Sequence, residues 1–194
     1  MKKITIFLIL FLSVLYVNAQ GKYEFSDEDI KENETQINQM VRYLQETLNF
    51  IGDPKVSAQE KDIIFKESYI KIFRDENVQV EDDLDENRGT SINKDVQAYL
   101  KDIDFFFENV SFEFEIQNIM PQLNEMSEPF FKVEMIRTIA GRNIIGDTIN
   151  NSTKRFLEIN IDPYKKELKI VSFYTTKPNV KDELFTWWNS MSKP

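Results

Sequence analysis

An acidic segment, EDDLDENRG, carries the oxygen ligands that a hard cation such as calcium prefers. Asp83, Asp85 and Asn87 alternate in it as ligands do at the start of a calcium-binding loop. However, Arg88 replaces the glycine of the sixth position, and Lys94 replaces the glutamate of the twelfth. We therefore interpret the segment as a solvated acidic loop, and we expect no metal site and no cofactor.

Aromatic residues concentrated between residues 99 and 114 could line an apolar pocket. They are Tyr99, Phe105, Phe106, Phe107, Phe112 and Phe114. Asp102 and Asp104 lie beside them in the sequence, and Tyr69 or Tyr99 could donate a hydrogen bond to a ligand. The alternative is that these residues only fill a core, as aromatic residues at helical or strand spacing commonly do.

The composition excludes several kinds of site. The chain has no histidine and no cysteine, which rules out zinc sites and catalytic triads built on them, and also disulfides. Its formal net charge of −9 makes nucleic acid an unfavourable partner, because the surface repels phosphate. The stability of the fold must therefore come from packing.

The first half of the chain predicts three helices, which cover residues 26–51, 57–73 and 93–103. In the first helix, apolar residues recur at spacings of three, four and seven, the pattern of one buried stripe. Ser26 and Ser57 are each followed three residues later by an acidic residue, as in a capping box. Asn93 is expected to cap the third helix.

The rest of the chain predicts mainly strands, at residues 77–81, 110–117, 131–139, 157–161 and 168–174, because apolar and polar residues alternate there. Asp162-Pro163 predicts a turn between the last two strands. The last strand has apolar residues on both faces, so we expect it in the interior of the sheet. Residues 140–153 contain Gly141, Gly146 and Asn150-Asn151, which predict a long connection.

Helices that precede a run of strands indicate the α+β class. This order of elements, over about residues 26–176, resembles the nuclear transport factor 2-like (NTF2-like) fold, in which a curved sheet wraps around three helices to form a cone. Three segments are similar to the N-terminal module of large secreted proteins of Gram-negative bacteria. They are EKDIIFKESYIKIFRDENVQVEDDLDENR, KDVQAYLKDIDFFF and FLEINID…LKIVSFYTTK. The resemblance implies three helices on a curved, mainly antiparallel sheet, with a short C-terminal helix.

The resemblance also implies what the cone could do. NTF2-like domains commonly hold a ligand inside it, and some are isomerases or dehydratases that use a carboxylate base in an apolar cavity, where burial raises the carboxyl pKa. Our leading hypothesis is a non-catalytic binding or interaction module. The alternative is such an enzyme, or a carrier of a small apolar ligand, with a carboxylate in the cone. The candidate ligand-binding residues are Tyr69, Tyr99, Asp102 and Phe106.

The start of the chain predicts a signal peptide at residues 1–19. Two lysines precede an apolar run at residues 4–17, and small residues precede Gln20. The run is shorter than the roughly 20 residues needed to span a bilayer, so we expect no membrane insertion after cleavage. The domain of residues 20–178 is then expected in the periplasm or outside a Gram-negative cell, with an unknown protein or a small apolar molecule as its partner.

Residues 179–194 predict a helical extension that Asn179 caps. Val180, Leu184, Trp187 and Met191 follow one another at spacings of four, three and four, which places them on one face. Trp188 lies about 100° away from Trp187 on such a helix. We expect Trp187 to pack against the domain and Trp188 to be available to a partner protein.

Export can be tested on the mature protein. If the signal peptide is cleaved as predicted, mass spectrometry of the envelope or secreted fraction will show an N-terminus at Gln20. An intact Met1 terminus in that fraction would contradict the prediction.

Overall fold

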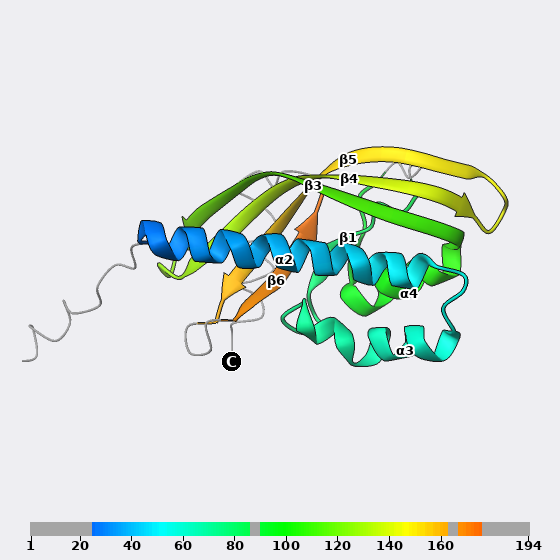
Figure 1. Ribbon diagram of the computed structural model, residues 1–194, viewed down its shortest axis with the longest axis horizontal. Helices are drawn as coiled ribbons and strands as arrows, with labels where there is room; N and C mark the ends of the chain where they lie inside the picture. The colour runs from blue at the N-terminus through cyan, green and yellow to red at the C-terminus, as the bar shows by residue number, and fades with distance from the viewer. Residues whose placement is uncertain (1–24, 86–89, 163–166, 176–194) are drawn as a thin grey trace, which may run out of the picture.

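The computed structural model describes residues 25–85, 90–162 and 167–175, in which three helices cover one face of a six-stranded sheet (Figure 1). The helical elements are α2 (Asp27–Gly52), α3 (Ala58–Lys66), the 3-10 turn η1 (Ser68–Lys71) and α4 (Val96–Phe106). Among these described helices, none is both long enough and apolar enough to cross a membrane.

Both predicted capping boxes are present. Oγ of Ser26 accepts a hydrogen bond from the Asp29 amide at 3.1 Å, and Oγ of Ser57 accepts one from the Glu60 amide at 3.3 Å. The prediction that Asn93 caps the third helix was wrong. Asn93 begins a short strand that pairs with residues 79–81, so α4 begins only after that strand ends.

The strands are β1 (Gln79–Glu81), β2 (Asn93–Asp95), β3 (Phe107–Leu123), β4 (Pro129–Asn143), β5 (Thr148–Ile161) and β6 (Leu168–Tyr174). Their order in the sheet is β2-β1-β6-β5-β4-β3, and every pair is antiparallel except β1 and β6. The expected α+β class and the interior position of the last strand are therefore confirmed. Register shifts within β3 accompany the curvature of the sheet over the helices, since a bulged strand bends (Figure 1).

The predicted long connection at residues 140–153 was wrong, because β4 and β5 form a hairpin with a turn at residues 144–147. Oδ1 of Asn143 holds the turn by accepting hydrogen bonds from the amides of Ile145 (3.1 Å) and Asp147 (2.9 Å). Gly146 supplies the positive φ of 93° that the turn needs. Gly141 lies within β4, where a Cβ atom would be only 2.2 Å from the carbonyl oxygen of Asn109.

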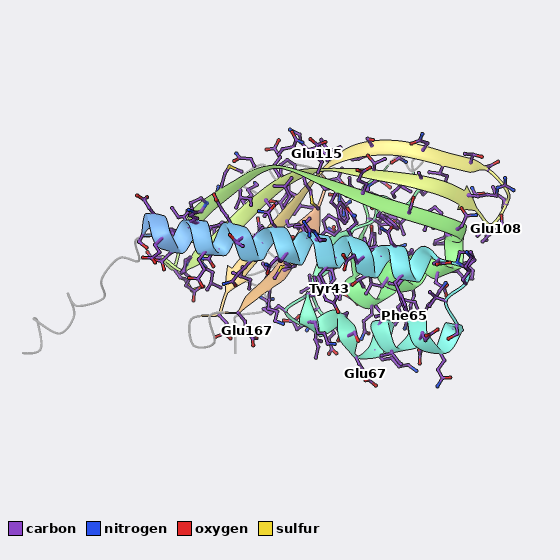
Figure 2. All side chains as sticks on the ribbon, in the orientation of Figure 1. Tyr43, Phe65, Glu67, Glu108, Glu115 and Glu167 are labelled. Atoms are coloured by element: carbon purple, nitrogen blue, oxygen red, sulfur yellow. The ribbon has the colours of Figure 1, made fainter. Side chains whose placement is uncertain are left out.

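The core lies between the helices and the inner face of the sheet. α2 contributes Ile37, Val41, Leu44, Leu48 and Ile51, and α4 contributes Val96, Tyr99, Leu100 and Ile103, all buried. Figure 2 shows Phe65 in the space between α3 and α4, and Glu115 on the opposite, outer side of the sheet. The strand face predicted to be buried is confirmed at Val110 and Phe112, while Phe114 is only partly buried.

Two side-chain amides of α2 cover the open edge of β3. The Phe112 amide donates to Oδ1 of Asn49 at 2.6 Å, and Nδ2 of Asn49 donates to the Phe112 carbonyl oxygen at 3.1 Å. The Phe114 amide donates to Oε1 of Gln45 at 2.7 Å. These bonds replace a neighbouring strand and fix α2 along the sheet edge.

Substitution of Asn49 tests this edge. Asn49→Ala removes both bonds to the Phe112 main chain and should reduce the free energy of unfolding by about 1–3 kcal/mol, as measured by urea denaturation. Asn38→Ala, at an exposed position of the same helix, should change it by less than about 0.5 kcal/mol. Equal effects would show that the amide bonds do not hold the edge.

Candidate functional site

The inner face of the sheet carries a polar layer among its apolar residues. Along β4 the inward residues are Phe131, Val133, Met135, Arg137 and Ile139, and all are buried. β5 places Arg155 inward in the same alternation as Leu157 and Ile159. Arg137 is 1% exposed and Arg155 is 0% exposed, so two guanidinium groups lie inside the curved sheet.

One carboxylate lies between the two guanidinium groups. Oδ2 of Asp83 is 2.6 Å from Nη2 of Arg137 and 3.1 Å from Nη1 of Arg155. These are charge contacts without the alignment of a hydrogen bond, whereas Oδ1 accepts a hydrogen bond from the Tyr99 hydroxyl at 3.1 Å. Nη1 of Arg137 donates to Oδ1 of Asn151 at 2.5 Å. Both oxygens of Asp83 are therefore occupied, and one negative charge directly contacts two positive ones.

The cluster is also tied to the ends of β1 and β6. Nη1 of Arg155 donates to the carbonyl oxygen of Glu81 at 2.9 Å and to Oγ1 of Thr175 at 2.7 Å. The Glu81 carboxylate accepts hydrogen bonds from the Thr175 amide (2.6 Å) and from Oγ of Ser91 (2.6 Å). Segments far apart in the sequence thus meet around Arg155.

Tyr99 donates the hydrogen bond that holds Asp83 in this cluster. Burial raises its pKa well above the ordinary value, and the negative charge of Asp83 raises it further, while the positive charges of Arg155 and Arg137 oppose the shift. The hydroxyl is therefore protonated at neutral pH. Its bond to Asp83 fixes the carboxylate in front of the arginines.

Three buried arginine nitrogens have no hydrogen-bond partner among the described residues: Nε of Arg137, and Nε and Nη2 of Arg155. In Arg155 these two atoms form one edge of the planar group, an edge that can bind both oxygens of a carboxylate. The face of the same group stacks on the Phe173 ring, with Cζ 3.9 Å from the ring centroid. Stacking does not satisfy N–H groups in the plane, and a buried donor without a partner costs about 1–3 kcal/mol.

The four residues predicted to bind a ligand do not line one cavity. Tyr99 is in the polar cluster, while Tyr69 is buried in the core as part of η1. Phe106 is 39% exposed at the end of α4 and contacts Phe105 edge to face on the surface. Trp188, predicted to bind a partner, lies outside the described residues.

Asp102 belongs to a separate ionic network. Nζ of Lys94 forms ion pairs with Asp102 and with Asp82, whose Oδ2 lies 2.6 Å away. Burial disfavours the charged form of Lys94, but its bonds to both carboxylates outweigh burial and raise its pKa.

The interpretation of the acidic segment as solvated was wrong at its start, because Glu81, Asp82 and the side chain of Asp83 are buried. In the described part of the chain, no group of three acidic side chains has a geometry suited to a metal ion.

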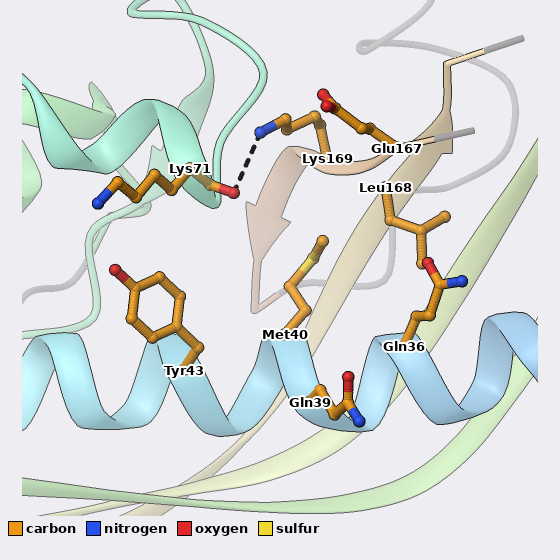
Figure 3. Close-up of a pocket in the computed structure, with 8 residues that line it drawn as sticks. All are labelled: Gln36, Gln39, Met40, Tyr43, Lys71, Glu167, Leu168 and Lys169. Carbon is orange, nitrogen blue, oxygen red and sulfur yellow. Dashed lines mark hydrogen bonds between the residues drawn. The ribbon is translucent and has the colours of Figure 1, made fainter. Parts of the chain in front are cut away.

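A groove of about 470 Å³ opens to solvent between α2 and the start of β6 (Figure 3). Its lining consists of Gln36, Gln39, Met40, Tyr43, Lys71, Glu167, Leu168 and Lys169. Nζ of Lys169 donates to the carbonyl oxygens of Ile70 (2.8 Å) and Lys71 (3.1 Å), so this charge already has partners. Since no residue of the groove has a buried polar atom without a partner, the polar layer around Arg155 is the better candidate site.

Sequence reasoning missed Arg137, Arg155 and the role of Asp83. A signal for the two arginines was present, because each occupies the inward phase of an alternating strand pattern. Buried charges are usually paired, so the inward position of the two arginines predicts a carboxylate close to them. Which carboxylate it is could not be read from the pattern, since Asp83 is remote in sequence from both arginines.

The chain is similar in structure to a nuclear transport factor 2-like superfamily protein from Salmonella enterica serovar Typhimurium LT2, with a TM-score of 0.51 and 9% identity over 79% of this chain and 99% of that chain. The chain has the NTF2-like fold. A second similar structure is ActVI-ORFA from Streptomyces coelicolor, with a TM-score of 0.45 and 9% identity over 77% of this chain and 99% of that chain. A third is the β subunit of benzoate 1,2-dioxygenase from Burkholderia mallei, with a TM-score of 0.42 and 10% identity over 84% of this chain and 98% of that chain. At these identities the likeness concerns the fold alone. No protein-family model and no curated protein sequence matches this chain.

The ionic cluster can be tested through the stability of the protein. Asp83→Asn keeps the shape of the side chain but leaves two buried guanidinium groups without their shared counter-charge. It should reduce the free energy of unfolding by about 3–5 kcal/mol in a denaturant titration. Asp62→Asn removes an exposed ion pair with Lys66 and should cost less than about 1 kcal/mol. A small effect of Asp83→Asn would show that the carboxylate does not hold the arginines.

Proposed function

We propose that the protein is a non-catalytic binding module that takes a small anionic ligand, with a carboxylate as its simplest form, into the NTF2-like cone. The observation that carries this proposal is the fully buried edge of Arg155, whose Nε and Nη2 have no hydrogen-bond partner among the described residues. A two-oxygen anion would accept hydrogen bonds from both atoms at once.

The charges at the site favour an anion over a neutral ligand. Two guanidinium groups directly contact a single carboxylate, Asp83, while the nearby Glu81 carboxylate bonds to Thr175 and Ser91 instead. A second negative group beside Arg155 would balance the charge of its guanidinium where solvent screening is weak. The apolar residues next to Arg155 on the inner face, Met135 and Leu157, would contact the rest of the ligand.

The same geometry gives less support to the alternative of an isomerase, a dehydratase or a carrier of a purely apolar ligand. A carboxylate base needs an oxygen that can reach the substrate proton. Asp83 has its oxygens occupied by Tyr99 and the two arginines, and Asp102 contacts Lys94. Asp83 therefore acts as the group that holds the arginines in place, and the bound molecule is retained unchanged.

The predicted signal peptide extends the proposal to where the protein acts, which is the periplasm or the cell exterior. An exported domain without disulfides, whose anion site is buried, suits the capture of a soluble acid outside the cytoplasm. The ligand reaches the site by a local opening of the segments that cover it, because Arg155 is fully buried in the closed form.

The proposal can be tested with sodium acetate, sodium succinate and sodium phosphate as probes, each compared with sodium chloride at equal ionic strength. A ligand that binds only the native state raises the melting temperature in a saturable way. We expect such a rise for at least one probe in the unmodified protein. Arg155→Lys should abolish it, because lysine keeps the charge but lacks the planar two-nitrogen edge.

Arg142→Lys is the matched control, since this β4 arginine is largely exposed and, among the described residues, forms only a distant pair with Glu108. It should leave the rise unchanged. A melting temperature that responds to no probe, or equally in both variants, would contradict anion binding at Arg155.

A further inference from the structure

A second cluster lies on the outer face of the sheet, which the helices do not cover (Figure 1). We call Lys132, Phe156, Glu158 and Tyr174 the outer seat. The rings of Phe156 and Tyr174 stack with centroids 5.5 Å apart, and Nζ of Lys132 lies 5.3 Å and 5.7 Å from the two centroids. The Tyr174 hydroxyl donates to Oε1 of Glu158 at 3.1 Å.

The outer seat is buried to an extent that a bare sheet face does not explain. Phe156 is 4% exposed and Tyr174 is 6% exposed, although both point away from α2, α3 and α4. Burial also raises the pKa of Glu158, against the opposing effects of Tyr174 and Lys132. Side chains on an open sheet face are normally partly solvated. The outer seat therefore presents an aromatic surface on which a further segment can pack.

The chain itself supplies a segment at this position. Tyr174 belongs to the outer seat and is the last residue of β6, and residues 176–194 follow directly. The sequence of residues 179–194 is amphipathic, with Val180, Leu184, Trp187 and Met191 on one helical face. We propose that residues 179–194 dock on the outer seat through this apolar face.

The lengths are compatible with this docking. Three residues, 176–178, separate Thr175 from the start of the amphipathic stretch and span at most about 11 Å, so the stretch begins close to Tyr174. A helix of residues 180–194 would be about 22 Å long, and neighbouring strands lie about 4.8 Å apart. It can therefore cross from β6 over β5 to Lys132 on β4.

The chemistry of the two surfaces also matches. The stacked rings of Phe156 and Tyr174 offer an apolar, aromatic surface, on which a tryptophan can pack edge to face or offset. With Trp187 on the seat, Trp188 lies about 100° around the helix and remains at the surface. The docked segment would thus cover one apolar surface of the sheet and present a single aromatic residue beside it.

Tryptophan fluorescence of the full chain tests the docking, because Trp187 and Trp188 are its two tryptophans and both lie in the segment. Phe156→Ala removes the centre of the outer seat. We expect it to shift the emission to longer wavelength and to increase quenching by iodide. Thr138→Ala, on the outer face of β4 but away from the seat, should change neither. Unchanged emission in folded Phe156→Ala protein would overturn the proposal.

Engineered disulfides provide a second measurement that does not depend on the stability of Phe156→Ala. The chain has no cysteine, so Lys132→Cys combined with Leu184→Cys gives one possible bond. Docking predicts a cross-link within one chain, since a disulfide needs Cα atoms roughly 4.4–6.8 Å apart. Thr138→Cys with Leu184→Cys should not form it.

Two results of the cross-linking experiment would overturn the proposal. A cross-link that joins two chains, with a dimer seen in size-exclusion chromatography with light scattering, would mean that a second copy covers the outer seat. Absence of any cross-link for Lys132→Cys paired in turn with Val180→Cys, Leu184→Cys and Trp187→Cys would mean that residues 179–194 do not reach it.

Discussion

The burial of two guanidinium groups around one carboxylate is the interaction on which the inner side of this fold depends. An isolated charge in the interior is very unfavourable, so Arg137 and Arg155 can face inward only if Asp83 is held between them. This requirement explains why the segment after β1 lies inside the sheet although it is strongly acidic. It also explains the parallel pairing of β1 with β6, because that pairing brings residues 81–83 next to Arg155.

Much of the fold could be predicted from the sequence because its signals are local. Each of these signals depends only on residues that are close in the sequence. They are the helix caps at Ser26 and Ser57, the alternation of apolar and polar residues in the long strands, and the apolar residues on both faces of residues 168–174. The prediction failed where a residue type that commonly marks a loop instead serves a contact with a residue distant in the sequence. Gly141 predicts a loop by type, but its lack of a side chain serves the close approach of β4 to Asn109 on β3.

The candidate site could be predicted only in part, because its pairing is not local. The alternation of β4 and β5 places Arg137 and Arg155 on the inner face, and the burial of Tyr99 follows from the stripe of α4. The position of Asp83 depends on how β1 enters the sheet, which no spacing in the sequence reveals. A search for a carboxylate in an apolar pocket therefore led to Asp102, whereas Asp83, the carboxylate between the buried arginines, is neutralised by them.

The polar layer around Arg155 and the outer seat are separated only by the thickness of the sheet. Arg155 points inward and Phe156 points outward from adjacent positions of β5, and on β6 Phe173 stacks under Arg155 while Tyr174 stacks on Phe156. Side chains on opposite faces of one strand pair share the same backbone, so a shift of β5 against β6 that reorients Arg155 also changes the stacking of Phe156 on Tyr174. An anion at Arg155 would stabilise one arrangement of this strand pair, and a segment docked outside would bias the same arrangement. Binding at Arg155 and docking on the outer seat, as proposed above, would therefore act on the same strand pair.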